Sequence, residues 1–280
     1  LCGNKNKILR AFPIIPGVDY AGVVEKSASD QYRPGDNVIM HGRAMGEQYS
    51  GGFSQYARTA AKDLVPMPGK LTARMSMLAG TAGATAALCV IALRESGYVP
   101  DGGAVVVSGA SGGVGSFAVM LLAKLGYEVV AVSRPAAADY LRGLGAADVI
   151  GRETMSADCR PLEKAKWHGG IDTVGGKVLA RMLAETRYGG VVAACGLAGG
   201  FDLPTTVMPF ILRGVRLDGV DSVMIPQDRR VQAWQLLADT LAADDYEKVF
   251  ADECALADAP AAARKILDGE VSGRFLVNPN

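Results

Sequence analysis

The chain has 280 residues, of which 49% are hydrophobic, and its 29 Lys and Arg balance its 29 Asp and Glu. A net charge of zero gives no basic surface that would attract nucleic acid or acidic membranes, and no apolar run is expected to span a bilayer. Five scattered cysteines without a CxxC pair are typical of reduced thiols in the cytoplasm. The composition predicts a cytoplasmic globular enzyme that is long enough for two domains.

The first part of the chain, residues 1–77, has the pattern of a β-rich domain. Short apolar stretches at 22–26, 37–40 and 53–58 predict strands, and Pro34, Gly35 and Asp36 form a turn signal between the first two. The chain begins at Leu1 with a polar stretch that leads directly into what resembles the middle of a domain. We therefore expect the N-terminal part of this domain to be missing.

Residues 78–225 alternate between helical and Val-rich segments. Helices are predicted at 79–95 and 177–185, and strands at 104–108, 128–132, 148–150, 170–173 and 190–195. This alternation is typical of an α/β domain with a doubly wound parallel sheet, the Rossmann arrangement.

A glycine-rich turn joins the first strand of this sheet to the next helix. Residues 103–134 read GAVVVSGASGGVGSFAVMLLAKLGYEVVAVSR, which is one β-α-β unit with its glycines at the strand-to-helix corner. Glycine lets the backbone approach a pyrophosphate, and the helix N-terminus offers unpaired N–H groups to it. A glycine-rich corner can also be purely structural, but the flanking strand and helix favour dinucleotide binding.

The end of the second strand of this unit selects between the two nicotinamide cofactors. NAD-specific sites usually carry Asp or Glu there, bound to the ribose 2′-hydroxyl. This chain has Ser133 and Arg134. A hydroxyl and a guanidinium bind a 2′-phosphate, which a carboxylate would repel, so the sequence predicts NADPH.

The C-terminal residues 226–280 are predicted to return to the first domain. An amphipathic helix places Val231, Trp234, Leu237 and Leu241 on one face. A further helix is predicted at 259–267, and a final strand at 274–277.

Several motifs together resemble the medium-chain dehydrogenase/reductase family. They are PGVDYAG at 16–22, RPGDNV at 33–38, GGFSQYA at 51–57 and GTAGATA at 80–86. Further runs are similar to its zinc-free acrylyl-CoA reductase branch, the YhdH-type proteins that are often described as quinone-oxidoreductase-like: RPLEK at 160–164, IDTVG at 171–175, CGLAGG at 195–200, LPTTVMPFILRGV at 203–215 and GVDSV at 219–223. The resemblance implies a Rossmann domain and a partial GroES-like catalytic domain.

The resemblance also implies which residues bind the cofactor. The phosphate loop would be Ser111, Gly112, Gly113 and Val114. The 2′-phosphate would be bound by Ser133 and Arg134 with help from Arg160, and the nicotinamide half by Leu197 and Ile211 with Ser222 nearby. Leu197 and Ile211 can equally be core residues, and Arg160 can equally be a solvated charge at the start of a helix.

The histidines and cysteines do not have the spacing of a zinc site. Gly17, Val18 and Asp19 stand where zinc-dependent relatives carry Gly-His-Glu, and neither His41 nor His168 has a cysteine at ligand spacing. We predict no metal, a structural role for Asp19, and a surface or lining position for His41.

Without a metal, reduction of an activated double bond is easier than alcohol oxidation, because the thioester carbonyl already withdraws charge. The resemblance therefore implies NADPH-dependent reduction of acrylyl-CoA or a similar short 2-enoyl-CoA. The alternatives are an NADPH:quinone oxidoreductase acting on quinones or enones, and a non-catalytic NADPH-binding protein. The resemblance also implies a homodimer formed through the edge of the nucleotide-binding sheet. The strand near 217–223 could supply that edge, or it could equally pair inside its own subunit.

The sequence identifies no proton donor. A tyrosine that the family carries before the region where this chain starts has no equivalent here. Tyr49 and Tyr56 are available, but structural roles fit both at least as well. Basic residues at the cleft mouth could anchor CoA, and the candidates are Lys5, Lys7, Arg10 and Arg43.

Overall fold

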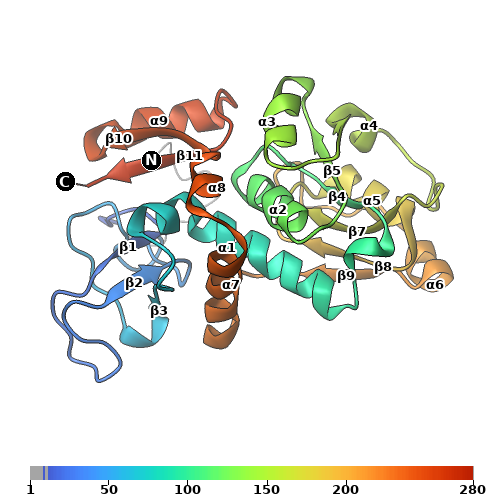
Figure 1. The fold of residues 1–280 in the computed structure, drawn as a ribbon. Coiled ribbons are helices and arrows are strands. Elements are labelled where there is room, and N and C mark those ends of the chain that lie inside the picture. The colour runs from blue at the N-terminus through green and yellow to red at the C-terminus, as the bar shows by residue number, and fades with distance from the viewer. Residues whose placement is uncertain (1–8, 10–11, 280) are drawn as a thin grey trace. The chain divides into compact units, whose positions relative to one another are not determined.

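The computed structural model describes Leu9 and residues 12–279, which form two compact units (Figure 1). One unit contains the described residues up to Ala84 together with those from Ser222 onward, and the other runs from Thr85 to Asp221. The predicted domain limits at residues 77 and 225 stay predictions.

The unit from Thr85 to Asp221 is built on a sheet of six parallel strands in the order β6-β5-β4-β7-β8-β9. The chain starts at the centre with β4 and winds outward in both directions, so the predicted doubly wound parallel sheet is confirmed. The strands are β4 (Val105–Val107), β5 (Val129–Ser133), β6 (Asp148–Gly151), β7 (Trp167–Asp172), β8 (Thr186–Ala194) and β9 (Arg216–Gly219). The helices are α2 (Gly113–Lys124), α3 (Ala138–Gly143), α4 (Arg152–Ser156), α5 (Gly176–Glu185) and α6 (Met208–Arg213).

Both faces of this sheet are buried, which explains its runs of consecutive valines. Val106 and Val130 pack with Leu179 and Met182 of α5 in one core cluster. Their neighbour Val105, which points to the opposite face, is also fully buried. A parallel sheet covered on both sides needs apolar side chains at successive positions, not alternate ones.

A long apolar helix, α1 (Ala73–Glu95), crosses the boundary between the units. The prediction that it starts at residue 79 is wrong, because two helical stretches meet there. Gly80 interrupts them with φ 51° and ψ −154°. The half-buried Asp19 accepts hydrogen bonds at its carboxylate from the backbone N–H and the hydroxyl of Thr81, so it caps the second stretch. The predicted structural role of Asp19 matches these contacts.

The expectation that no apolar run could span a bilayer is also wrong for α1. Its 23 residues are long and apolar enough by length and composition. However, 78% of its apolar window is buried inside the protein. A helix in the core of a folded protein needs the same composition as a membrane span, so this finding is weak support for a span.

In its described residues, the other unit contains two small sheets, the first part of α1 and three further α-helices. Strands β1 (Tyr20–Val23), β2 (Asn37–Met40) and β3 (Val65–Pro66) pair antiparallel, and β10 (Phe250–Ala255) pairs parallel with β11 (Arg274–Asn278). The helices are α7 (Gln227–Thr240), α8 (Ala243–Glu247) and α9 (Ala259–Leu267). The predicted amphipathic helix is therefore confirmed as α7, with Trp234 and Leu237 fully buried and Val231 40% exposed.

The strand predicted at 53–58 is wrong. These residues form bends without strand pairing, because the preceding glycines are held against another loop. The N–H groups of Gly51 and Phe53 donate to Ile15 and Pro16, and a Cβ at Gly51 would lie 2.0 Å from the carbonyl oxygen of Gly17. Backbone that packs this closely cannot also form a regular strand.

Candidate cofactor site

The glycine-rich corner between β4 and α2 has the geometry of a phosphate loop. Gly109 has φ 57°, and a Cβ there would lie 2.2 Å from the hydroxyl of Thr173. The N–H of Gly112 donates to the carbonyl of Gly109 over 2.9 Å and closes the turn. Gly112, a predicted phosphate-loop residue, therefore shapes the loop, because its own amide already has a partner.

Three amides at the start of α2 have no hydrogen bond in the described part of the chain. They belong to Gly113, Val114 and Gly115, and α2 begins at the first of them with no side-chain cap. A Cβ on Gly115 would lie 2.3 Å from the oxygen of Gly109. Sequence reasoning placed Gly115 in the glycine pattern but not among the binding residues. Three unpaired N–H groups and the positive end of the helix dipole fit an anion.

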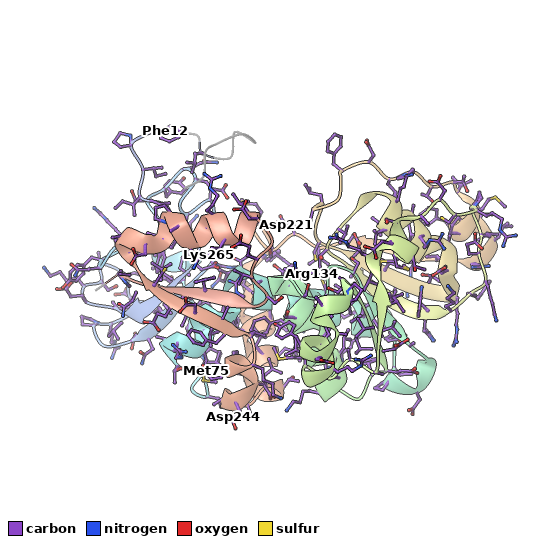
Figure 2. The ribbon with its side chains drawn as sticks, turned by 90° about the horizontal axis from the view of Figure 1, so that it is seen from above. Phe12, Met75, Arg134, Asp221, Asp244 and Lys265 are labelled. Carbon is purple, nitrogen blue, oxygen red and sulfur yellow. The ribbon has the colours of Figure 1, made fainter. Side chains whose placement is uncertain are left out.

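The next strand brings the predicted 2′-phosphate residues to the same loop. Ser133 ends β5, and its hydroxyl hydrogen-bonds the hydroxyl of Ser111 over 2.9 Å. Ser133 is 6% exposed. Arg134, which is labelled in Figure 2, follows it in the chain and is half-buried. Two hydroxyls and a guanidinium beside the phosphate loop fit the phosphates of a dinucleotide.

The chain's own carboxylate binds the loop that leads into the neighbouring helix α5. Asp172 ends β7 and accepts hydrogen bonds from the Gly175 amide at 2.8 Å and the Ser108 hydroxyl at 2.6 Å. Burial raises the pKa of Asp172, and these donors lower it in part. The amide of Cys195, at the end of β8, donates to the carbonyl of Asp172. Asp172 thus fixes the carboxyl ends of three strands, a role that the sequence did not reveal.

The residues predicted for the nicotinamide half lie on exposed segments or in the other unit. Leu197 is 66% exposed in the loop after β8, and Ile211 is 72% exposed on α6, so the alternative that they are core residues is wrong. Ser222 is 9% exposed and lies in the unit that contains the N-terminal residues.

Arg160 lies on the loop after α4 and not at the start of a helix. Its guanidinium pairs with Glu163 over 2.9 Å, and its side chain is 78% exposed. It lines a hollow with Ala180 and Thr205, so its predicted part in 2′-phosphate binding stays a prediction.

Comparison with known proteins places this geometry in a family. Models described as "Zinc-binding dehydrogenase" and "Alcohol dehydrogenase GroES-like domain" match residues 113–239 and 3–69. The probable acrylyl-CoA reductase AcuI of Escherichia coli (strain K12) is 54% identical over 278 residues, which cover 99% of this chain and 85% of the relative. The chain belongs to the medium-chain dehydrogenase/reductase family.

Two further members of the medium-chain dehydrogenase/reductase family are similar along most of their length. A crystal structure of the yhdH oxidoreductase from Salmonella enterica in complex with NADP has a TM-score of 0.95 and 53% identity, covering 97% of this chain and 84% of that one. The putative quinone oxidoreductase YhfP of Bacillus subtilis (strain 168) is 44% identical over 272 residues, 96% of this chain and 82% of the relative. The resemblance inferred from the motifs, and the expected GroES-like domain, are confirmed.

The described side chains do not fit the zinc ion of the family's zinc-dependent members. In the described ranges, no three His, Cys, Asp or Glu side chains are grouped so that they could hold a metal. Asp19 is bonded to Thr81, and the Nδ1 atom of His168 to the Gly102 carbonyl. No step of the reaction is therefore derived through zinc.

The expectation that His41 lies on the surface or lines a site is wrong, because its side chain is fully buried. Its Nε2 atom accepts a hydrogen bond from Arg230 over 3.2 Å, and its ring packs edge-on against Trp234 with 5.7 Å between the centroids. The local sequence around His41 gave no signal for this, because Arg230 is 189 residues away.

The buried His41 is expected to make the protein sensitive to acid. Burial first, and then the charges of Arg230 and Arg43, lower the pKa of His41 to about 3. The pKa of a histidine in an unfolded chain is about 6.5. Below that pH the unfolded state binds a proton at His41 and the native state does not, so the native state loses stability relative to the unfolded one. This stabilisation is complete above pH 6.5 and is lost as the pH falls toward 3. Between pH 7 and 5, wild type should lose about 2 kcal/mol more unfolding free energy than His41→Asn.

Denaturant titrations at several pH values measure this difference. All other groups titrate alike in the two proteins, so the difference between their curves isolates His41. Parallel curves from pH 7 to 5 would contradict the assigned pKa.

Three of the remaining candidates from the sequence lie in the described part of the chain. Tyr49 and Tyr56 are 62% and 74% exposed, so most of each residue's surface is in contact with solvent. The guanidinium of Arg43 donates to the Ile225 carbonyl over 2.8 Å and lies 3.5 Å from Asp63. Lys5, Lys7 and Arg10 lie outside the described residues.

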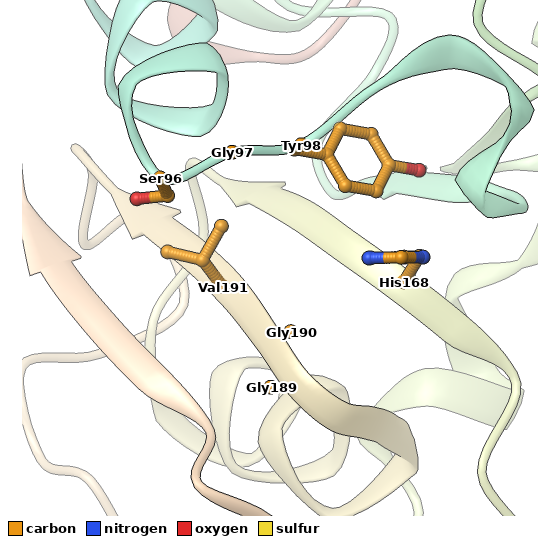
Figure 3. A pocket seen from close by; sticks show the side chains of 7 residues that line it. All are labelled: Ser96, Gly97, Tyr98, His168, Gly189, Gly190 and Val191. Atoms are coloured by element: carbon orange, nitrogen blue, oxygen red, sulfur yellow. The ribbon is translucent and has the colours of Figure 1, made fainter.

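One cavity in the nucleotide-binding unit lies away from the phosphate loop. It has a volume of about 150 Å³ and is lined by Tyr98, His168 and the chain around Gly189 and Gly190, as Figure 3 shows. These residues stand at the amino-terminal ends of β7 and β8, whereas phosphate groups bind at the carboxyl ends of parallel strands. We therefore assign it no part in cofactor binding.

Proposed function

We propose that the chain is an NADPH-dependent reductase of the C=C bond of acrylyl-CoA or a similar short 2-enoyl-CoA. The observation that carries this proposal is its 54% identity, over 99% of its length, to a probable acrylyl-CoA reductase. The phosphate loop beside Ser133 and Arg134 supports the cofactor. The exposed Leu197 and Ile211 offer apolar surface for the nicotinamide half, with Ser222 as a further contact.

The bound cofactor would supply a hydride to the β-carbon of the substrate. The chain's own residues would hold and orient the cofactor: the amides of Gly113, Val114 and Gly115 would take the pyrophosphate, and Ser133 and Arg134 the 2′-phosphate. The α-carbon gains a proton, so the products are the saturated acyl-CoA and NADP⁺. Because the thioester stabilises the developing enolate, the protein chiefly has to position the two reactants and exclude water.

Consumption of NADPH by the purified chain tests this function directly. One arm contains acrylyl-CoA, one contains crotonyl-CoA, and a third replaces NADPH with NADH, with mass spectrometry of the acyl-CoA product. We expect propionyl-CoA to form from acrylyl-CoA with NADPH. Absence of this product, with NADPH bound and the protein folded, would refute the proposal.

Arg134→Ala is expected to weaken NADPH binding about 10- to 100-fold and to leave NADH binding unchanged. A charge-assisted hydrogen bond contributes about 1.5 to 3 kcal/mol, and NADH lacks the phosphate that makes it. The measurement is the dissociation constant of each cofactor by fluorescence titration. Arg142→Ala is the matched control, because Arg142 is exposed on α3 and pairs only with Asp139 among the ion pairs described. Equal losses for both cofactors would remove Arg134 from the 2′-phosphate site.

Quinone reduction is the second candidate, because a relative with 44% identity is named a putative quinone oxidoreductase. A benzoquinone arm in the same assay separates the two. Turnover with quinone alone favours this second function, and NADPH binding without turnover in any arm favours a binding protein.

We also infer a homodimer in the cytoplasm. Strand β9 stands at one end of the six-stranded sheet, where a second copy can pair with its free edge. Cys89, Cys159, Cys195 and Cys254 are free thiols, which fits a reducing compartment. Sedimentation velocity measures the mass in solution, and a monomer at micromolar concentration would contradict the dimer.

A further inference from the structure

The segment that carries Arg134 is held to the phosphate loop on its N-terminal side at two points. The carbonyl of Val132 accepts a hydrogen bond from the Ala110 amide over 3.2 Å. The hydroxyls of Ser133 and Ser111 lie 2.9 Å apart. Both contacts precede Arg134 in the chain, so neither holds the residues after it to the phosphate loop.

A third hydrogen bond restrains the segment on its C-terminal side. The hydroxyl of Tyr140, on α3, donates to the hydroxyl of Ser116 over 2.9 Å. Ser116 in turn donates to the carbonyl of Ala110 over 3.3 Å. Ala110 is therefore bonded through its N–H to one end of the Arg134 segment and through its carbonyl, by way of Ser116, to the other end.

These bonds and the chain between them form a closed ring. It runs from Ala110 through Ser116 and Tyr140, back along the chain past Arg134 to Val132, and again to Ala110. Helix α3 has only six residues, so it is too short to stay rigid without tertiary contacts. The Tyr140 hydroxyl is thus an anchor for Arg134 on that side.

The partner of Tyr140 is placed so that it also affects the amides of the phosphate loop. Ser116 is fully buried in the first turn of α2 and directly follows Gly115, whose amide is unpaired. A buried hydroxyl that loses its partner does not regain one from water, so its hydrogen bond is worth more than a surface one.

We infer that Tyr140 and Ser116 are positioning residues that set selectivity for the cofactor's 2′-phosphate by fixing Arg134 against the phosphate loop. The inference rests on the proposed use of NADPH and goes beyond it, because neither residue belongs to the expected binding set. Neither is assigned a contact with the cofactor, and both act through Arg134 and Ala110.

Tyr140→Phe, Ser116→Ala and the double variant test the inference. The dissociation constants of NADPH and NADH are measured for each, together with kcat at saturating NADPH. Tyr140→Phe removes one hydrogen bond of about 1 kcal/mol, so it should weaken NADPH binding about fivefold and leave NADH binding and kcat unchanged. Ser116→Ala also removes the hydrogen bond to the Ala110 carbonyl, so it should weaken NADPH binding at least as much. The double variant should be no weaker than Ser116→Ala, because that change already removes the bond to Tyr140.

Tyr127→Phe is the matched control. Its hydroxyl is also buried and donates to the Tyr98 carbonyl over 3.0 Å, but it lies at the start of β5, away from the phosphate loop. It should leave the selectivity for NADPH unchanged. If Ser116→Ala does not fold, the isosteric Tyr140→Phe decides alone.

Two outcomes would overturn this inference and leave the proposed cofactor standing. One is unchanged NADPH binding in Tyr140→Phe. The other is an equal loss of affinity for NADPH and NADH, which indicates a merely structural role. Wild-type protein that binds NADH as tightly as NADPH would overturn the proposed cofactor, and this inference with it. The wild-type ratio is therefore measured first, so that the two failures are distinguished.

Discussion

Gly115→Ala is expected to weaken NADPH binding by about 5- to 100-fold. The added Cβ would lie 2.3 Å from the Gly109 oxygen and 2.6 Å from the Ala110 Cα, so backbone must move on both sides. Overpacking of this kind costs about 1 to 3 kcal/mol, and each 1.4 kcal/mol is tenfold in affinity. Because the shift moves the amides that would take the pyrophosphate, NADH should lose affinity as much as NADPH. Fluorescence titration with both cofactors measures the loss.

Gly143→Ala is the matched control for a Cβ added to a helix of the same unit. No atom lies within 4 Å of the position that this Cβ would take. Cofactor affinity should not change, and the helix should gain slightly in stability. If Gly115→Ala kept wild-type affinity for both cofactors, the start of α2 could not be the pyrophosphate site.

Arg230→Met is expected to lower the unfolding free energy by about 3 to 5 kcal/mol. The guanidinium is fully buried and bridges segments far apart in sequence, with hydrogen bonds of 2.6 Å to the carbonyls of both His41 and Asp63. Burial lowers its pKa to about 10, so it stays charged at neutral pH. Methionine fills most of the volume but leaves both buried carbonyls and the His41 ring without a donor. Urea unfolding at pH 7 measures the effect.

Two other variants separate the charge from the geometry of its hydrogen bonds. Arg230→Lys keeps the charge but not the planar set of donors, so it should recover less than half of the lost stability. Arg229→Met, at the preceding half-buried position of α7, should cost less than about 1 kcal/mol. If Arg230→Met lowered the unfolding free energy no more than Arg229→Met, the buried hydrogen bonds of Arg230 would make no net contribution to stability.

The parts of the site that follow from local sequence could be predicted, and those that depend on distant contacts could not. The β4-turn-α2 corner and the placement of Arg134 at the end of β5 follow from glycines and valines within about thirty residues, a β-α-β unit. The Ser108–Asp172 bond joins residues 64 positions apart, and the ring that restrains α3 depends on which face of that short helix meets α2. No periodicity in a single sequence reports such a contact.

Errors in the fold have the same origin. The burial of His41 depends on Arg230, so its polar type suggested a surface position that the tertiary structure does not give it. The start of α1 was misplaced because a glycine in an apolar run reads as an ordinary helical residue, while the actual break depends on the Asp19 carboxylate, 62 positions away from Thr81.

The carboxylate of Asp172 at the start of α5 makes the binding edge asymmetric. An anion that approaches α2 meets unpaired amides, whereas one that approaches α5 meets a carboxylate that is bonded to the amides of Val174 and Gly175 just before that helix. A dinucleotide lying in the reverse direction would place its phosphates against that charge. Compounds meant to compete with the cofactor should therefore carry their acidic group at the α2 end and a neutral group toward α5. A compound with the two groups exchanged should bind more weakly.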